Sequence, residues 1–152
     1  MPVKKQLKKV VKRFFDFSTL INHLNAEDPL ALVIRGHLYV EAALIKQIES
    51  ALVNKNAFDT AALCFPTKVK LAVALGKVDS ADVGGFTALN DVRNKFVHNV
   101  EMRLTKQDEL NLYNALSPSQ RKTYDGPRKA ELVLVRRLRF DIMGLIANAA
   151  KP

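Results

Sequence analysis

Cysteine is nearly absent from this chain, whose 152 residues include only Cys64. A single cysteine cannot form an internal disulfide, and the sequence has neither a CxxC pair nor a cluster of histidines and cysteines at zinc-ligand spacing. We therefore predict an intracellular, reduced setting with no metal site and no cofactor. Cys64 lies between Leu63 and Phe65, which favours a place in the core over a role as a nucleophile.

Long apolar runs are also missing. No run approaches the roughly 18 to 20 residues of a membrane span, and the first residues lack the apolar centre of a signal peptide. No segment alternates apolar and polar side chains between hairpin turns, so we predict no sheet. These absences favour a cytoplasmic protein without a membrane partner, and the length suits a single domain over residues 1–152.

Acidic residues are scarce: 15 Asp and Glu oppose 24 Lys and Arg, which gives a formal net charge of +9. This excess favours encounter with polyanions such as RNA, DNA or an anionic membrane, without selecting one of them. Basic residues concentrate at the start, where apolar residues at helical spacing predict a basic amphipathic helix over residues 1–24. Its basic face is either solvated or contacts RNA or a protein partner. The candidate RNA contacts there are Lys4, Lys5, Lys8, Lys9, Lys12 and Arg13.

Helical periodicity is abundant. The pattern predicts helices over residues 29–53, from either 59 or 66 to 75, and over 81–96, 105–116 and 128–149. Asp28 with the proline after it, and Thr105 with Asp108, are typical of helix starts, whereas Gly76 is typical of a stop. We predict an all-α, up-and-down bundle of about five or six helices whose core lies in residues 29–149.

Two polar residues interrupt the apolar face of the helix predicted over 29–53. At about 100° per residue, His37 and Glu41 fall on the same face as Leu44 and Ile48. A buried carboxylate without a partner is costly, so Glu41 should have a cationic or hydrogen-bonding partner elsewhere in the fold. We expect His37 to be a core histidine with a hydrogen-bonding partner.

The most distinctive stretch is 89–99, which places Arg93, Asn94 and His98 in an otherwise core-forming helix. Arg93 falls about 40° from Leu89 on the apolar face, whereas Asn94 and His98 share a different face. Arg93 and His98 differ by about 140° around the axis. They converge only if the helix loosens, if Arg93 reaches along it, or if a second copy of the chain supplies the missing side chain.

This trio suits RNA cleavage without a metal. His98 can take the proton of a ribose 2′-OH or give one to the leaving 5′-oxygen, because histidine titrates near neutrality. Arg93 can stabilise charge on the phosphorane oxygens, and Asn94 can orient a phosphate or hydroxyl. Structural roles are the alternatives, with Arg93 in a buried ion pair and His98 placed favourably at a helix C-terminus.

The same residues carry a resemblance. Arg93, Asn94 and His98 resemble the R-x4-6-H signature of the HEPN superfamily, all-helical domains that include metal-independent ribonucleases, many of them toxins or defence proteins. Residues 35–38, 68–76 and 88–94 are similar to the mannitol operon repressor family, which is HEPN-like in fold and described as a transcriptional regulator.

The resemblance implies a homodimer whose two motifs line a shared groove. Arg93 and His98 would be its catalytic pair, and 2′,3′-cyclic phosphate ends its products. We add the expectation that Glu41, with His37 nearby, is the buried partner that fixes Arg93, and that Lys95 contributes to RNA binding.

Three functions follow as hypotheses. The first is an endoribonuclease of HEPN type that cleaves single-stranded RNA, acting as a toxin or defence protein restrained by an antitoxin. The second is a non-catalytic regulator or protein-interaction module of the mannitol-repressor type, although no helix-turn-helix is evident. The third is a nucleotide-binding HEPN module that accompanies a nucleotidyltransferase; it would bind nucleotide through groove side chains, because the chain has no glycine-rich phosphate loop.

Overall fold

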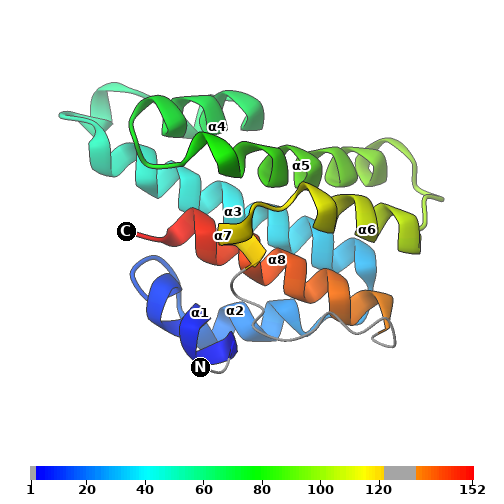
Figure 1. Cartoon of the computed structure of the whole chain (residues 1–152). Coiled ribbons are helices and arrows are strands. Elements are labelled where there is room, and N and C mark those ends of the chain that lie inside the picture. Colours follow the sequence, from blue (N-terminus) through cyan, green and yellow to red (C-terminus); the bar gives the residue numbers. More distant parts are fainter. Residues whose placement is uncertain (1–2, 122–132) are drawn as a thin grey trace.

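The computed structural model describes residues 3–121 and 133–152, and all regular secondary structure in these ranges is helical (Figure 1). The predicted all-α bundle is therefore confirmed. The α-helices are α1 (Val3–Val11), α2 (Phe17–Leu24), α3 (Pro29–Ala51), α4 (Phe65–Ala74), α5 (Val83–His98), α6 (Lys106–Ala115), α7 (Pro118–Arg121) and α8 (Leu134–Ala150). Short 3-10 turns at Lys55–Ala57, Thr60–Ala62 and Ser80–Asp82 connect them.

Helix α3 is the central element of the bundle. It packs along α8, and it also contacts α2, α4 and α5. Figure 1 shows α4 and α5 on one side of the α3–α8 pair and α1 and α2 on the other, while α6 and α7 lie along α5 and α8. Two distinct outer faces result, one formed with α4 and α5 and one formed with α1 and α2.

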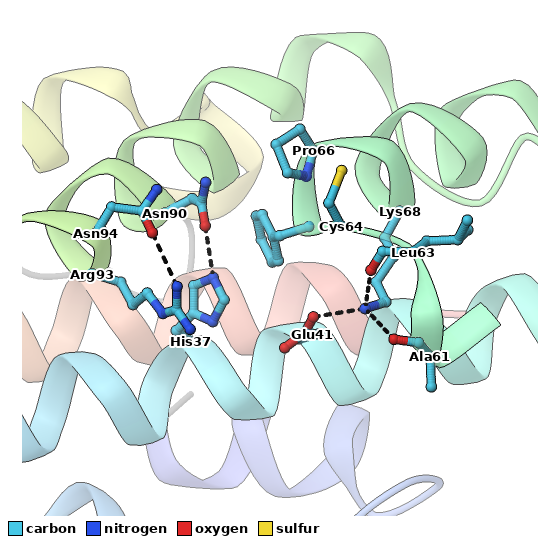
Figure 2. A pocket seen from close by; sticks show the side chains of 11 residues that line it. His37, Glu41, Ala61, Leu63, Cys64, Pro66, Lys68, Asn90, Arg93 and Asn94 are labelled. Atoms are coloured by element: carbon cyan, nitrogen blue, oxygen red, sulfur yellow. Dashed lines mark hydrogen bonds and ion pairs between the residues drawn. The ribbon is translucent and has the colours of Figure 1, made fainter. Parts of the chain in front are cut away.

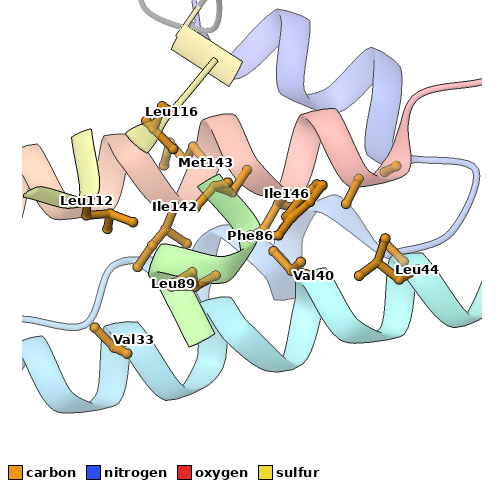
Figure 3. Close-up of a cluster of buried hydrophobic side chains, with 14 of the residues drawn as sticks. Val33, Val40, Leu44, Phe86, Leu89, Leu112, Leu116, Ile142, Met143 and Ile146 are labelled. Carbon is orange, nitrogen blue, oxygen red and sulfur yellow. The ribbon is translucent and has the colours of Figure 1, made fainter. Parts of the chain in front are cut away.

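The core lies where α3, α5 and α8 meet (Figure 3). Val40 of α3, Phe86 and Leu89 of α5, and Ile142 of α8 have no exposed surface, and each such side chain contributes about 1.5 to 3 kcal/mol when removed from water. A Cβ atom at Gly36 would lie 2.5 Å from Cγ2 of Ile142, so glycine is what allows α3 and α8 to approach this closely.

Capping side chains and a glycine determine where several helices begin and end. Asp28 caps α3 by accepting a hydrogen bond from the Leu30 amide, and Thr105 with Asp108 forms a reciprocal capping box at the start of α6. Gly76, after α4, has a φ of 72°, which suits glycine. Of the two predicted starts for the helix that ends near residue 75, the later one is correct, since Thr60 opens only a 3-10 turn.

The predicted single helix over residues 1–24 is wrong. It is divided into α1 and α2 by residues 12–16, because Asp16 accepts a hydrogen bond from the Thr19 amide and so caps a new helix. Both helices bury apolar residues in the common core, so this segment belongs to the bundle. The predicted last helix is α8, which begins at Leu134 within the described residues; positions 128–132 lie outside them.

Candidate functional site

A polar pocket of about 420 Å³ lies between α3, α4 and α5 (Figure 2). We call it the α3–α4–α5 pocket. Its polar lining residues are His37, Glu41, Cys64, Lys68, Asn90, Arg93 and Asn94. Three helices distant in sequence thus bring together four of the candidate side chains, His37, Glu41, Arg93 and Asn94, along with three that the sequence does not mark.

Arg93 and Asn94 act as a pair within this pocket. Nη1 of the half-buried Arg93 donates a hydrogen bond to Oδ1 of Asn94 at 3.0 Å. Throughout residues 3–121 and 133–152, no ion pair joins Arg93 to a carboxylate. The guanidinium therefore keeps its charge uncompensated and retains donors for a ligand.

Glu41 is not the partner of Arg93, contrary to our prediction. It pairs instead with Lys68 of α4, whose Nζ lies 2.7 Å from Oε1 of Glu41. The same ammonium donates to the carbonyl oxygens of Leu63 at 2.7 Å and Ala61 at 3.1 Å (Figure 2). Lys68 is only 2% exposed, and these three acceptors satisfy all three of its donors.

The sequence contains a signal for the buried position of Lys68, which is not among the residues predicted for the site. The buried residues of α4 are Phe65, Lys68, Val69 and Ala72, so the lysine occupies the apolar stripe at i, i+3, i+4 and i+7. A lysine on such a stripe needs a buried acceptor. Helix α3 offers that acceptor in Glu41, the carboxylate on its own apolar face.

His37 is a buried core histidine with a hydrogen-bonding partner, as predicted. It is 4% exposed, its ring lies 4.4 Å from that of Phe65, and its Nε2 lies 3.0 Å from Oδ1 of Asn90. Burial is the main cause that lowers the pKa of His37, and the charges of Arg93 and Lys68 lower it further against the opposing effects of Asn90 and Glu41. The imidazole is therefore neutral near pH 7, with Nε2 as the donor to Asn90.

His98 lies outside the pocket. It is the last residue of α5, it is exposed, and it is not among the residues that line the pocket. Helix α5 stays α-helical through His98, so the helix does not loosen there. Of the three ways in which the trio could converge, the structure shows Arg93 reaching Asn94 along the helix, while His98 remains apart from both.

Cys64 is exposed, which contradicts the predicted core position. It is the residue that precedes α4, at the N-cap, so its side chain points away from the core and lines the pocket. Its Sγ lies 3.0 Å from Oγ1 of Thr67. This hydrogen bond is the main cause that lowers the pKa of the thiol.

The predicted basic residues lie on two different faces. Lys5, Lys8, Lys9, Lys12 and Arg13 are exposed on or just after α1, across α3 and α8 from the pocket (Figure 1). The side chain of Lys4 lies outside the description. Lys95 is exposed on α5, where its Nζ lies 3.6 Å from Oδ1 of Asp108. The α1 cations and the Arg93 motif therefore do not form one continuous surface in a single chain.

The lining charges of the pocket give one net positive charge. The Lys68 ammonium is balanced by Glu41, and His37 is neutral, so the remaining charge is that of Arg93. Within the described residues, no group of three or more His, Cys, Asp or Glu side chains is arranged to hold a metal ion. The arrangement suits a singly charged anion.

Comparison of the chain with family models, with curated proteins and with solved structures finds no match. None of the helices in the described part of the chain is long and apolar enough to span a membrane.

Proposed function

We propose that this chain is a metal-independent endoribonuclease of the HEPN type, similar to the mannitol operon repressor family in its scaffold, that acts on single-stranded RNA in the cytoplasm. The observation that carries the proposal is the half-buried Arg93 guanidinium, which lines a polar pocket beside Asn94 without an ion pair to any described carboxylate. A charged group held in this way fits an anionic ligand.

The charge of the pocket supports a phosphodiester as that ligand. A phosphodiester carries one negative charge, and the lining of the pocket leaves one uncompensated positive charge on Arg93. Arg93 donors can contact the non-bridging oxygens, where charge grows during phosphoryl transfer. Asn94, already oriented by its hydrogen bond with Arg93, can present its amide NH₂ to the same phosphate.

The proposed reaction is attack of a ribose 2′-oxygen on the adjacent phosphorus. The bond from phosphorus to the 5′-oxygen breaks, which leaves a 2′,3′-cyclic phosphate and a 5′-hydroxyl. One imidazole accepts the proton of the 2′-OH, and an acid donates a proton to the leaving 5′-oxygen. Because His98 lies outside the pocket of its own chain, a homodimer would have to bring the two His98 side chains to a shared groove.

A non-catalytic regulator is the second candidate, and one observation favours it. His98 is exposed and separate from Arg93 and Asn94 within one chain. In that case the pocket would bind an anionic group of a partner protein or effector, and the cleavage chemistry would be absent. An antitoxin or regulatory protein remains a proposed partner under either function.

The test is RNA cleavage by the purified full chain in EDTA. Wild type is compared with His98→Ala and Arg93→Ala, and with Thr87→Ala as a matched control at an exposed position of α5. We expect His98→Ala to reduce the rate by about 10²- to 10⁴-fold. Arg93→Ala should reduce it by about 10²- to 10³-fold. Thr87→Ala should cleave like wild type.

The products and the controls decide between the two candidates. Cleavage with 2′,3′-cyclic phosphate ends that disappears in His98→Ala supports the ribonuclease. No cleavage by wild type, or equal cleavage by wild type and His98→Ala, excludes it and leaves the regulator. Melting temperatures of all four proteins establish that a lost rate does not reflect unfolding.

A further inference from the structure

A second pocket lies on the other outer face of α3. It has a volume of about 390 Å³ and we call it the aromatic pocket; its lining residues are Phe15, His23, Arg35, Leu38, Tyr39 and Ala42. At about 100° per residue, the α3 residues of this pocket point about 130° away from His37 and Glu41. The aromatic pocket is therefore separate from the α3–α4–α5 pocket.

Three aromatic side chains that contact one another, Phe15, Tyr39 and His23, line the aromatic pocket. The rings of Phe15 and Tyr39 meet edge to face at 5.1 Å, and the Tyr39 hydroxyl lies 2.8 Å from Nδ1 of His23. All three side chains are partly exposed. Leu38 is 57% exposed at the pocket, so an apolar surface faces the solvent beside the rings.

Cations surround this apolar surface. Lys46 lies with its Nζ 5.2 Å from the Phe15 ring centroid, Arg13 stacks at 4.3 Å over Phe14, and the exposed Arg35 lines the pocket itself. In the described part of the chain these cations form no ion pair with a carboxylate. The nearby Asp16 is engaged at the start of α2, where it accepts hydrogen bonds from Thr19.

Partly exposed rings flanked by unpaired cations are the combination that binds single-stranded nucleic acids. Bases stack on the aromatic side chains while Lys and Arg follow the phosphates. Arg35 and Lys46 are eleven residues apart on α3, about 16 Å along the helix, so they can contact phosphates on either side of a stacked base. A membrane surface or an acidic protein could match the charge but would not need an open pocket lined by rings.

We propose that the aromatic pocket and the nearby cations Arg13, Arg35 and Lys46 form a binding surface for single-stranded nucleic acid, with a base stacked at Phe15 and Tyr39. This surface does not depend on cleavage at Arg93 and His98.

The test measures binding of fluorescein-labelled oligouridylate of about 12 nucleotides, and of the matching oligothymidylate, by fluorescence anisotropy. The full-length chain carries His98→Ala throughout, so that any cleavage activity does not remove the probe. Phe15→Leu keeps apolar bulk and removes the ring, and Leu38→Glu places a carboxylate at an exposed position of the pocket. Arg35→Ala removes one cation, with Lys70→Ala and Lys106→Ala as controls at exposed lysines on α4 and α6.

We expect Phe15→Leu and Leu38→Glu each to weaken binding by about fivefold or more. Arg35→Ala should lower the slope of log affinity against log salt by about 0.7, the value for one phosphate contact on a single strand. Lys70→Ala and Lys106→Ala should leave affinity and slope unchanged. Tighter binding of the RNA probe identifies RNA as the ligand, and equal binding of both probes identifies single strands of either kind.

Two results would overturn the proposal: no binding of either probe, or equal losses in the pocket variants and the control variants. Melting temperatures check that Phe15→Leu remains folded. Leu38→Glu repeats the test at an exposed position, where a substitution does not disturb core packing. Because the assay uses the His98→Ala chain, a failure of the ribonuclease proposal leaves this result intact, and the reverse also holds.

Discussion

Replacing Glu41 by Gln should destabilise the fold substantially, although the change removes no atom from the core. In the native structure the Lys68 ammonium is 98% buried, and Glu41 is its one ion-pair partner among residues 3–121 and 133–152, while the carbonyls of Ala61 and Leu63 complete its hydrogen bonds. Glutamine keeps an oxygen that can accept from Nζ but removes the opposing charge. The variant therefore leaves a buried cation without a counter-charge.

The magnitude follows from the burial of the two partners. Breaking a buried ion pair by removing one charge costs about 3 to 5 kcal/mol. The Glu41 side chain is 25% exposed, so water moderates the cost, and the retained amide hydrogen bond reduces it further. We expect Glu41→Gln to lower the free energy of unfolding by about 2 to 4 kcal/mol, equivalent to roughly 4 to 16 °C in melting temperature for a chain of this size.

Urea unfolding followed by circular dichroism measures this change, with Glu101→Gln as a control at an exposed glutamate. The double variant Glu41→Gln with Lys68→Met removes both charges. It should be more stable than Glu41→Gln alone, because the buried cation that caused the penalty is gone. A loss below about 1 kcal/mol in Glu41→Gln, or a double variant less stable than that single variant, would refute the reasoning.

Three further predictions concern packing and titration. Gly36→Ala should lower the free energy of unfolding by about 1 to 2 kcal/mol, because its Cβ would lie 2.5 Å from Cγ2 of Ile142. At Gly84 the nearest atom to an added Cβ is 3.4 Å away, so Gly84→Ala should be neutral or stabilising. Thermal unfolding compares the two variants. An NMR titration should show a pKa for His37 in the folded protein below its unfolded value of about 6.5. Neutral His37 therefore contributes its full stability above about pH 6.5, and this contribution is lost as the pH falls from this value towards the folded pKa. Cys64 should react with iodoacetamide at a lower pH than an ordinary exposed thiol, and an unshifted pH profile would contradict the hydrogen bond assigned to it.

The helix starts could be predicted because their causes are local. Asp28 and Thr105 cap helices through groups within three residues of themselves, and a sequence shows such spacing directly. The division at Asp16 is equally local and could also have been predicted, because aspartate is a common capping residue. The amphipathic pattern over residues 1–24 favoured one helix only because α1 and α2 both turn an apolar face to the same core.

The partners inside the candidate site could not be predicted in the same way. Helical periodicity places Glu41 and Arg93 on inward-facing sides of their helices, where they line the pocket half-buried, but it does not say which residues meet across a helix interface. Glu41 meets Lys68, 27 residues away, because α4 rather than α5 packs against that turn of α3. His37 likewise meets Asn90, 53 residues away. The hydrogen bond between Arg93 and Asn94 depends on a side-chain conformation of Arg93 that no spacing rule determines.

The packing of α3 against α8 has a kinetic consequence. Gly36 contacts Ile142, and Gln47 donates to the carbonyl of Ala149 across 102 residues, so the central helix pair joins widely separated parts of the sequence. Folding must therefore close a loop of about 100 residues before this interface forms, which slows folding relative to helical bundles with mainly local contacts. Helices α4 and α5 lie within that loop. The pocket they form with α3 therefore lies on a helix whose packing is complete only when α8 has docked.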